Sequence, residues 1–370
     1  MTSPKILTNE EKNELLKQNS YIQVSNSIDL AVNELFDIEY PHKKDSKTDQ
    51  ELVDYKLHLI GDNSDDWGVW VYFEWLNRLV HFPPKDMLRK LRTSRNRNLI
   101  NTEEQLKLYN STIMIIGMSV GSNIVEALVS QGIGGKLILV DLDIIEPTNL
   151  NRIRAPYHQI GIHKVDAISQ RMWEIDPFLD IVPIYEGLNS QNLVELLEQN
   201  IDIIVDEMDE LSMKVALREE AKIRRIPVVM AADDGDNALI DVDRYDLDPH
   251  LELFGGLIPA EIINRVKNES IQRAELGMII GKYFVGPEHI PLRMFESLSE
   301  VGKTLPSWPQ LGGAATLSGV CVAYLCKNII LGHKVSHGRT LVSLDEKLSQ
   351  QELSADEQQR FEQFLKMMKS

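Results

Sequence analysis

Residues 112–141 read TIMIIGMSVGSNIVEALVSQGIGGKLILVD, and this stretch decides the fold class. It predicts a strand at 112–116, a turn with glycines at its two ends, a helix at 122–131 and a second strand at 136–141. Both strands are almost continuous runs of Ile, Leu, Val and Met, which is typical of strands buried on both faces of a parallel sheet. The stretch therefore predicts an α/β domain with helices on both faces of its sheet.

The same alternation continues towards the C-terminus. Strands are predicted at 181–185, 201–206 and 227–231, and helices at 164–174, 191–199 and 211–224. This order predicts a doubly wound, Rossmann-like α/β fold with a mostly parallel sheet. The alternation ends in an acidic, glycine-containing stretch at 233–236. After it we expect a strand at 238–242, an irregular helical region at 259–300 and a long apolar helix at 311–331.

Two further segments flank this domain. Residues 1–91 form a small α+β segment, in which aromatic and β-branched residues at 67–82 surround a polar break and predict a hairpin. The hairpin either covers a neighbouring domain or offers an edge that captures an extended peptide. Residues 336–370 form a tail that ends in an amphipathic helix. We therefore expect three parts, at 1–91, 92–335 and 336–370.

The composition argues against several classes of protein. The 370 residues contain 39 Lys and Arg against 56 Asp and Glu, and the net charge of −17 disfavours a nucleic-acid partner. Two cysteines build neither a disulfide framework nor a four-cysteine zinc site, which favours a reducing, cytoplasmic location. The first residues carry charge where a signal peptide needs an apolar core. The longest uncharged stretch, 304–326, falls short of about 18 apolar residues, so no membrane span is expected.

The turn after the first strand, Gly117-Met-Ser119-Val-Gly121, fits two functions. Small residues let the backbone approach a phosphate, and the following helix presents free N–H groups to it. The same residues spell G-x-S-x-G, the nucleophile elbow of α/β-hydrolases, which also requires a histidine such as His333 or His337. Asp141 favours a nucleotide, because it lies 24 residues after Gly117, close to the spacing at which a carboxylate accepts ribose hydroxyls.

Charged residues follow several of the predicted strand ends. Asp143 and Arg152 come after the second strand, Lys164 opens the next helix, and Asp209 follows the fourth strand. Arg binds phosphate oxygens in pairs, Lys supplies a point charge, and a carboxylate holds Mg²⁺. Asp143 either tightens its own loop or faces the ligand. The pattern predicts a triphosphate site beyond the strand ends, and six positive charges at 84–98 indicate an anion nearby.

The block formed by Asp141, Asp143, Asn149, Leu150 and Arg152, written D-x-D…N-L-x-R, resembles that of the ThiF/MoeB/E1-like adenylyltransferases. The resemblance covers about residues 92–242 and is weaker at 311–331. It implies an enzyme that activates a carboxylate with ATP. It also implies that Asp141 binds the ribose and that Asn149 and Arg152 contact the phosphates.

The resemblance reaches residues outside this block. Lys164 would also contact the phosphates, and Asp209 would hold Mg²⁺. Arg97 looks like the arginine that family members insert into the partner subunit's site, which implies a homodimer. Three departures concern the positioning of ATP. These are the altered glycine loop, Ile153 in place of a glutamine, and Glu210 in place of an asparagine.

The resemblance also suggests a class of substrate. The zinc-binding cysteine pairs of many relatives are missing, so no structural zinc is expected. With its long N-terminal segment, the chain is more similar to members that modify ribosomally made peptides, as in the microcin C and pantocin antibiotic pathways. We therefore expect adenylation of a carboxylate of a peptide or small protein, with release of pyrophosphate. E1-like activation of a ubiquitin-like or sulfur-carrier protein, with Cys321 or Cys326 as thioester nucleophile, and α/β-hydrolase chemistry remain alternatives.

Overall fold

The chain divides into two compact units, which we describe separately. The computed structural model describes residues 3–268, 271, 273–349 and 353–369. Unit 1 contains residues 1–106, 130–132 and 169–180, and unit 2 contains residues 107–129, 133–168 and 181–370. The division at residues 91 and 335 stays a prediction. Part of the predicted helical region at 259–300 lies outside the described residues.

Unit 1 is built on a four-stranded sheet with the order β1-β3-β4-β2. Its strands are β1 (Lys5–Leu7), β2 (Gln23–Asn26), β3 (Val69–Phe73) and β4 (Arg78–Phe82). Its helices are α1 (Asn9–Gln18), α2 (Ile28–Glu39), α3 (Asp49–Ile60) and α4 (Lys85–Thr93), and α5 (Thr102–Tyr109) leads into unit 2. The α1 helix begins with a capping box, in which the Thr8 hydroxyl accepts from the N–H of Glu11 and the Glu11 carboxylate accepts from the N–H of Thr8.

The predicted hairpin is confirmed as the antiparallel pair β3 and β4. The expectation that the hairpin itself offers a free edge is wrong. The β1 strand pairs with β3 and β2 pairs with β4, so both hairpin strands lie inside the sheet. Within the described residues, the outer edges of this sheet belong to β1 and β2.

Unit 2 contains a seven-stranded sheet with the order β11-β10-β9-β8-β5-β6-β7. The strands are β5 (Thr112–Ile116), β6 (Lys136–Val140), β7 (Asp180–Ile184), β8 (Ile203–Asp206), β9 (Val228–Asp234), β10 (Asn237–Asp243) and β11 (Gly338–Val342). Strands β6, β5, β8 and β9 are parallel neighbours, whereas β10 and β11 are antiparallel additions. The predicted doubly wound α/β fold with a mostly parallel sheet is confirmed.

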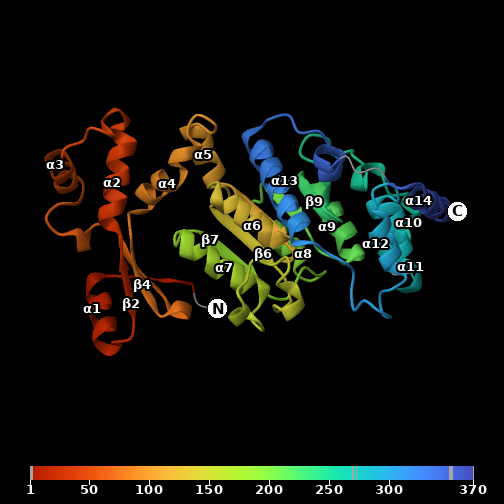
Figure 1. The fold of residues 1–370 in the computed structure, drawn as a ribbon, viewed down its shortest axis with the longest axis horizontal. Coiled ribbons are helices and arrows are strands. Elements are labelled where there is room, and N and C mark those ends of the chain that lie inside the picture. Colours follow the sequence, from red (N-terminus) through yellow and green to blue (C-terminus); the bar gives the residue numbers. More distant parts are fainter. Residues whose placement is uncertain (1–2, 269–270, 272, 350–352, 370) are drawn as a thin grey trace. The chain divides into compact units, whose positions relative to one another are not determined.

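Helices cover both faces of this sheet, as the apolar strands predict. On one face, Met114 and Ile116 of β5 pack with residues of α8 (Leu193–Leu197) and α9 (Leu211–Arg224). The other face carries α6 (Gly121–Ser130) and α13 (Gly312–Leu331), which lie side by side (Figure 1) because Gly319 of α13 leaves room for the backbone of Asn123. The remaining helices are α7 (Lys164–Ile175), α10 (Ala260–Lys267), α11 (Arg273–Ile279), α12 (Leu292–Leu298) and α14 (Ala355–Lys369).

Some predicted boundaries need correction. The β9 strand does not end at residue 231 but runs to Asp234, and a turn at Gly235 leads straight into β10. The acidic stretch is therefore the tip of a hairpin, because its residues pair with β10 across the turn. The predicted helix at 191–199 is shorter, since α8 covers only Leu193–Leu197.

The long apolar helix is confirmed as α13. By length and composition, it is the one helix among the described residues that could cross a membrane, and half of its most apolar window is buried inside the protein. It packs on β9 and β10. Burial raises the pKa of the Cys326 thiol in this helix to about 12, and burial also raises the pKa of Cys321. Neither thiol has the lowered pKa of a reactive nucleophile.

Candidate active site

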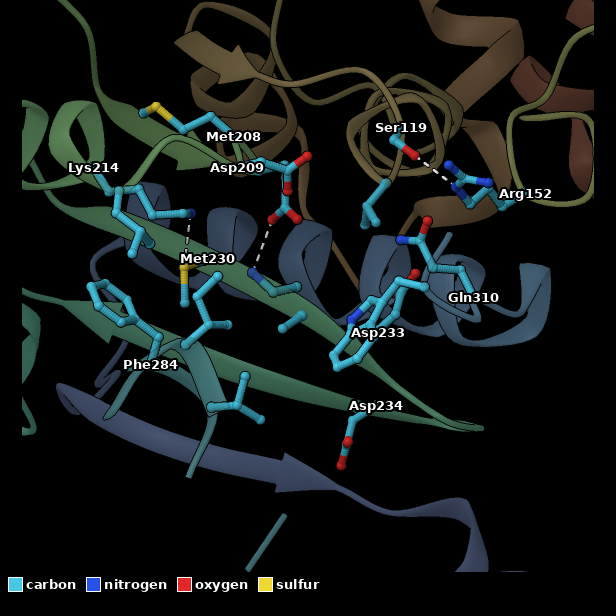
Figure 2. Close-up of a pocket in the computed structure, with 18 of the residues that line it drawn as sticks. Ser119, Arg152, Met208, Asp209, Lys214, Met230, Asp233, Asp234, Phe284 and Gln310 are labelled. Atoms are coloured by element: carbon cyan, nitrogen blue, oxygen red, sulfur yellow. Dashed lines mark hydrogen bonds between the residues drawn. The ribbon is translucent and has the colours of Figure 1, made fainter. Parts of the chain in front are cut away.

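A cavity of about 480 Å³ lies in unit 2, beyond the carboxyl ends of the parallel strands (Figure 2). This is the place where open parallel sheets bind ligands. Of the predicted site residues, those that line the cavity are Ser119, Asp143, Asn149, Arg152, Lys164 and Asp209. Gly117, Gly121 and Asp141 are not among the residues that line it. The structure thus brings together charged residues that are far apart in the sequence.

The turn after β5 is shaped by its two glycines. Gly117 has a φ of +90°, and a Cβ atom there would lie 2.4 Å from the carbonyl oxygen of Glu207. Gly121 faces Ile115, whose Cγ2 would lie 3.1 Å from an added Cβ. Both glycines therefore allow close packing of the turn against neighbouring elements. Their predicted contact with a nucleotide stays a prediction.

Asp141 joins the turns that follow β5 and β6. One carboxylate oxygen accepts from the backbone N–H of Met118 at 2.6 Å, and the other accepts from the N–H of Asp143 at 2.7 Å. Burial raises the pKa of Asp141, and the positive charge of Lys164 opposes this shift. Asp141 therefore holds the two turns in place, and the predicted ribose contact is not tested by this arrangement.

Asp143 and Lys164 form an ion pair at the mouth of the cavity. The Lys164 Nζ lies 2.7 Å from a carboxylate oxygen of Asp143, and the backbone N–H of Lys164 donates to the carbonyl of Asp143 at 3.0 Å. The Lys164 side chain is about nine-tenths buried, whereas that of Asp143 is mostly exposed. A cation at the first residue of α7 opposes the helix dipole, so it favours a nearby anion such as Asp143 or a phosphate.

Arg152 is held at the cavity wall by three hydrogen bonds. Its Nε donates to the Ser119 hydroxyl at 2.9 Å, and its Nη1 donates to the Thr148 carbonyl at 3.3 Å and to the Asn151 side chain at 3.1 Å. Asn149 is buried beside it, with its side-chain oxygen accepting from the N–H of Glu146. The guanidinium is therefore oriented before any ligand binds.

The hydrogen bond from Arg152 to the Ser119 hydroxyl argues against a nucleophile elbow at Ser119. A nucleophilic serine needs a base, usually an imidazole, within hydrogen-bond reach. Ser119 instead accepts from an arginine. Within the described residues His333 bonds to Asn328, and neither His333 nor His337 lines the cavity. The geometry thus favours anion binding over acyl-enzyme chemistry.

Asp209 projects from the loop between β8 and α9. It is exposed, lines the cavity, and follows Asp206, the last residue of β8. The residue at the N-cap of α9 is Glu210, so Asp209 lies in the loop before the helix. Its carboxylate is thus available to a ligand or a metal ion. Asp209 lies on one side of the cavity and Arg152 on the other (Figure 2).

Comparison with known proteins identifies the central part of the chain. The family model described as ThiF family matches residues 93–239. The chain contains a ThiF family domain. The match covers the strands from β5 to β9 and the start of β10, so the ThiF domain supplies the charged residues described above.

Relatives share this domain over part of their length. The chain is 33% identical over 278 residues to the uncharacterized protein MT1398 of Mycobacterium tuberculosis, which covers 74% of this chain and 38% of that protein. It is 31% identical over 138 residues to a Bacillus subtilis tRNA threonylcarbamoyladenosine dehydratase, covering 37% of this chain and 54% of that protein. E. coli MccB, solved with MccA-N7isoAsn, is 15% identical with a TM-score of 0.46, covering 83% of this chain and 80% of that chain. The chain spans about two fifths of the length of MT1398 and about half of the length of the Bacillus dehydratase.

Below the cavity, an ionic network fixes the end of β8. The Asp206 carboxylate accepts from Lys214 at 3.0 Å and from Arg218 at 2.5 Å, and Arg218 also donates to Asp243 at 2.9 Å. All four side chains are nine-tenths buried or more. Although burial opposes it, the charges of Lys214 and Arg218 lower the pKa of Asp206. The network fixes the start of the loop that carries Glu207, the next residue, and Asp209, two residues further on.

Sequence reasoning missed an acidic wall of the cavity. Its members are Glu207, Asp233 and Asp234, which come from the ends of β8 and β9. Glu207 accepts from the N–H of Ala231 at 2.9 Å, and burial raises its pKa well above the ordinary value. Asp233 accepts from the Ser318 hydroxyl at 3.0 Å. The signal was the acidic stretch at 233–236, at which the alternation of strands and helices was expected to end.

Arg97 belongs to unit 1. It is exposed and follows the short turn at Ser94–Asn96. Three other cations of the basic run are already paired within the unit, namely Arg89 with Asp86, Lys90 with Glu39 and Arg92 with Asp176. The donation of Arg97 to a partner subunit stays a prediction.

The acidic wall predicts a stability that depends on pH. Burial, with a smaller contribution from Asp345, raises the pKa of Asp234 to about 7 from 3.8. Between about pH 4 and pH 7 the unfolded chain ionises this carboxyl more readily than the folded protein does. The free energy of unfolding therefore falls as the pH rises from about 4 towards 7. We predict that Asp234→Asn raises the melting temperature more at pH 8 than at pH 5. The expected rise is about 2 °C or more for each kcal/mol by which the substitution increases the free energy of unfolding. Scanning fluorimetry measures the shift.

The exposed Asp180 provides the control for this prediction. Asp180→Asn removes a carboxylate at the surface, so its melting temperature should follow that of the parent protein at both pH values. An equal effect of Asp234→Asn at pH 5 and pH 8 would contradict the assignment of a raised pKa.

Proposed function

We propose that the chain is an ATP-dependent adenylyltransferase that activates a carboxylate as an acyl-adenylate. The observation that carries this proposal is the convergence of Arg152, Lys164 and Asp209 on one cavity of the ThiF domain. Its volume lies within the range of about 300–1,000 Å³ that is common for small-ligand sites. The described cations suit a polyphosphate, and the neighbouring apolar residues, such as Met230 and Phe284, suit the nucleoside.

The proposed reaction needs little proton transfer. A substrate carboxylate is already ionised at neutral pH and attacks the α-phosphate of ATP through an oxygen. A new O–P bond forms as the bond to the leaving pyrophosphate breaks, and pyrophosphate takes the electron pair. Arg152 and Lys164 stabilise the charge on the phosphates and hold the triphosphate in line with the attacking oxygen.

The cavity also fits the Mg²⁺ that accompanies ATP. Among the described residues, no three His, Cys, Asp or Glu side chains form a complete metal cage. Mg²⁺ does not need such a cage when a nucleotide is present, because one or two carboxylates and the phosphates hold it. Asp209 is the exposed carboxylate that would bind it. When bound, the ion neutralises phosphate charge.

Arg152 provides the first test of this proposal. We predict that Arg152→Ala weakens ATP binding about 10-fold or more, because a charged hydrogen bond contributes about 1.5–3 kcal/mol. The matched control is Arg154→Ala, which removes a guanidinium that donates to Thr316 and Asn123 and does not line the cavity. Calorimetric titration with ATP should show a loss of affinity for the first variant only. Equal affinities for the two variants would contradict the site.

Asp209 gives a second arm of the same titration. Asp209→Asn should remove the gain in ATP affinity that Mg²⁺ provides and leave metal-free ATP binding unchanged. The neighbouring Glu210 is the control, because its carboxylate accepts from the Ser212 hydroxyl. A full Mg²⁺ effect in Asp209→Asn would show that another group holds the ion.

We further propose that the carboxylate belongs to a peptide, in the maturation of a ribosomally made natural product. The raised pKa values of Cys321 and Cys326 favour this over the E1-like alternative, which needs a reactive thiol. The Bacillus relative makes tRNA a second candidate, but the net charge of −17 opposes a polyanion.

The peptide would add to the outer edge of β2 in unit 1. The N–H of Gln23 donates to the Asn77 carbonyl, on the side of β2 that faces β4. Successive N–H groups along a strand point to opposite sides, so the N–H of Val24 points to the open edge of the sheet. The Val24 side chain is about half exposed, as is suitable for a contact with an added strand. This replaces the hairpin edge, which the structure shows to be internal.

A backbone substitution tests the peptide site. Val24→Pro removes the outward N–H without touching the ladder to β4, so it should abolish binding of peptides selected from a random library on the full chain. Val24→Ala keeps that N–H and should retain most of the binding. Hydroxylamine, ATP and Mg²⁺ added to the parent protein should convert a bound peptide acid to its hydroxamate. Peptides that bind Val24→Pro as tightly as the parent would contradict this site.

A further inference from the structure

A second cavity, of about 760 Å³, adjoins the proposed ATP cavity in unit 2. The two cavities share the lining residues Asp233, Ile290, Met294 and Gln310. The second cavity extends from this boundary along α12 towards α14. A molecule in the second cavity would thus approach the first at Asp233.

The second cavity is strongly acidic among the described residues. Two guanidinium groups, those of Arg293 and Arg360, line it, and Arg360 is paired with Glu296. The carboxylates that line it are Asp233, Asp236, Glu288, Glu296, Asp345 and Glu357. An excess of carboxylates in a recessed site concentrates cations and repels anions.

The boundary carries buried carboxylate oxygens that lack a partner. Asp233 uses one oxygen to accept from Ser318, and its other oxygen is buried with no hydrogen bond within the described part of the chain. Asp234 is only 2% exposed, lines the first cavity, and also has a buried oxygen without a hydrogen bond among the described residues. An unpaired buried carboxylate oxygen is costly to maintain. Asp233 lines both cavities, so a cation in the second cavity would lie near its charge.

We propose that the second cavity binds a primary amine in its ammonium form, and that this amine is the acceptor of the acyl group. An ammonium group supplies both the positive charge and the N–H donors that the boundary lacks. This inference rests on the proposed adenylation, because the acceptor needs an acyl-adenylate in the first cavity. Water, an alcohol or a carboxylate does not match the charge of the second cavity.

In the proposed transfer of the acyl group to the amine, every proton and electron pair has an acceptor. The ammonium gives one proton to water, and the nitrogen lone pair forms a C–N bond with the acyl carbon. The C–O bond to the phosphate breaks, and AMP leaves with the electron pair. The nitrogen of the adduct is more acidic than a free ammonium, and its second proton passes to the carboxylate of Asp233. The products are an amide, AMP and two protons.

The charge on Asp233 suits this role. Burial raises its pKa to about 6, and the Ser318 hydroxyl and the positive charge of Arg152 oppose the shift. At neutral pH most of the group is therefore a carboxylate that can pair with an ammonium and accept a proton.

Three probes of equal length test the proposal on the full chain with ATP and Mg²⁺ present. They are 5-aminopentan-1-ol, pentane-1,5-diol and 5-hydroxypentanoate, which differ in one terminal group. Saturation-transfer NMR should show binding of the amine alone. Asp233→Asn and Glu288→Gln, which both change a residue lining the second cavity, should each weaken the amine about 5-fold or more, whereas Asp180→Asn should not. Glu288 is exposed, so its variant keeps the test valid if Asp233→Asn is unstable.

Three results would overturn the inference. They are equal binding of the diol, amine binding unchanged in both cavity variants, and amine binding that ATP abolishes. ATP affinity measured on the same samples separates the two claims. Intact ATP binding without amine binding removes only the amine acceptor, whereas loss of ATP binding in the parent protein removes the proposed function and this inference together.

Discussion

The site depends on the position of one carboxylate, that of Asp141. Its two oxygens bind backbone N–H groups in two different turns, at Met118 and Asp143. Hydrogen bonds to a charged acceptor are among the stronger ones in proteins. The bond from Met118 is buried, and the bond from Asp143 is partly buried. They tie the glycine turn after β5 to the acidic turn after β6. The bond from Arg152 to Ser119 adds a second tie between the same loops, so the side of the cavity that we propose for the phosphates is held in place before a ligand arrives.

The sheet topology divides the cavity into a cationic and an acidic side. Because β5 lies between β6 and β8, the loops after these strands meet at one edge. The loop after β6 supplies Arg152 and leads to Lys164, whereas the ends of β8 and β9 supply Asp209 and Asp233. A negatively charged nucleotide and a positively charged second substrate would thus meet at the boundary. The buried network around Arg218 keeps the acidic side in place.

Local sequence patterns were enough to predict the ThiF core. The β5 strand and α9 lie where the apolar runs and the helical pattern placed them, because their burial is set by their own residues. The extension of β9 through Asp233 and Asp234 could not be predicted in this way. Two adjacent acids before Gly235 are typical of a loop, and only pairing with β10 makes them a strand. Similarly, β1 and β2 enclose the hairpin through pairings that are distant in sequence.

The candidate site was predictable in its charges but not in its contacts. Arg152, Lys164 and Asp209 follow strand ends, and parallel strands bring such positions together. No pattern indicated that Ser119 would bind Arg152, or that residues such as Trp308 and Gln310 would line the cavity, because these contacts arise from the packing of distant segments. The most direct measurement is a crystal structure of the full chain with Mg²⁺ and α,β-methylene-ATP. The account predicts its α-phosphate in contact with Arg152 or Lys164 and the ion on Asp209. A triphosphate bound away from all three side chains would contradict it.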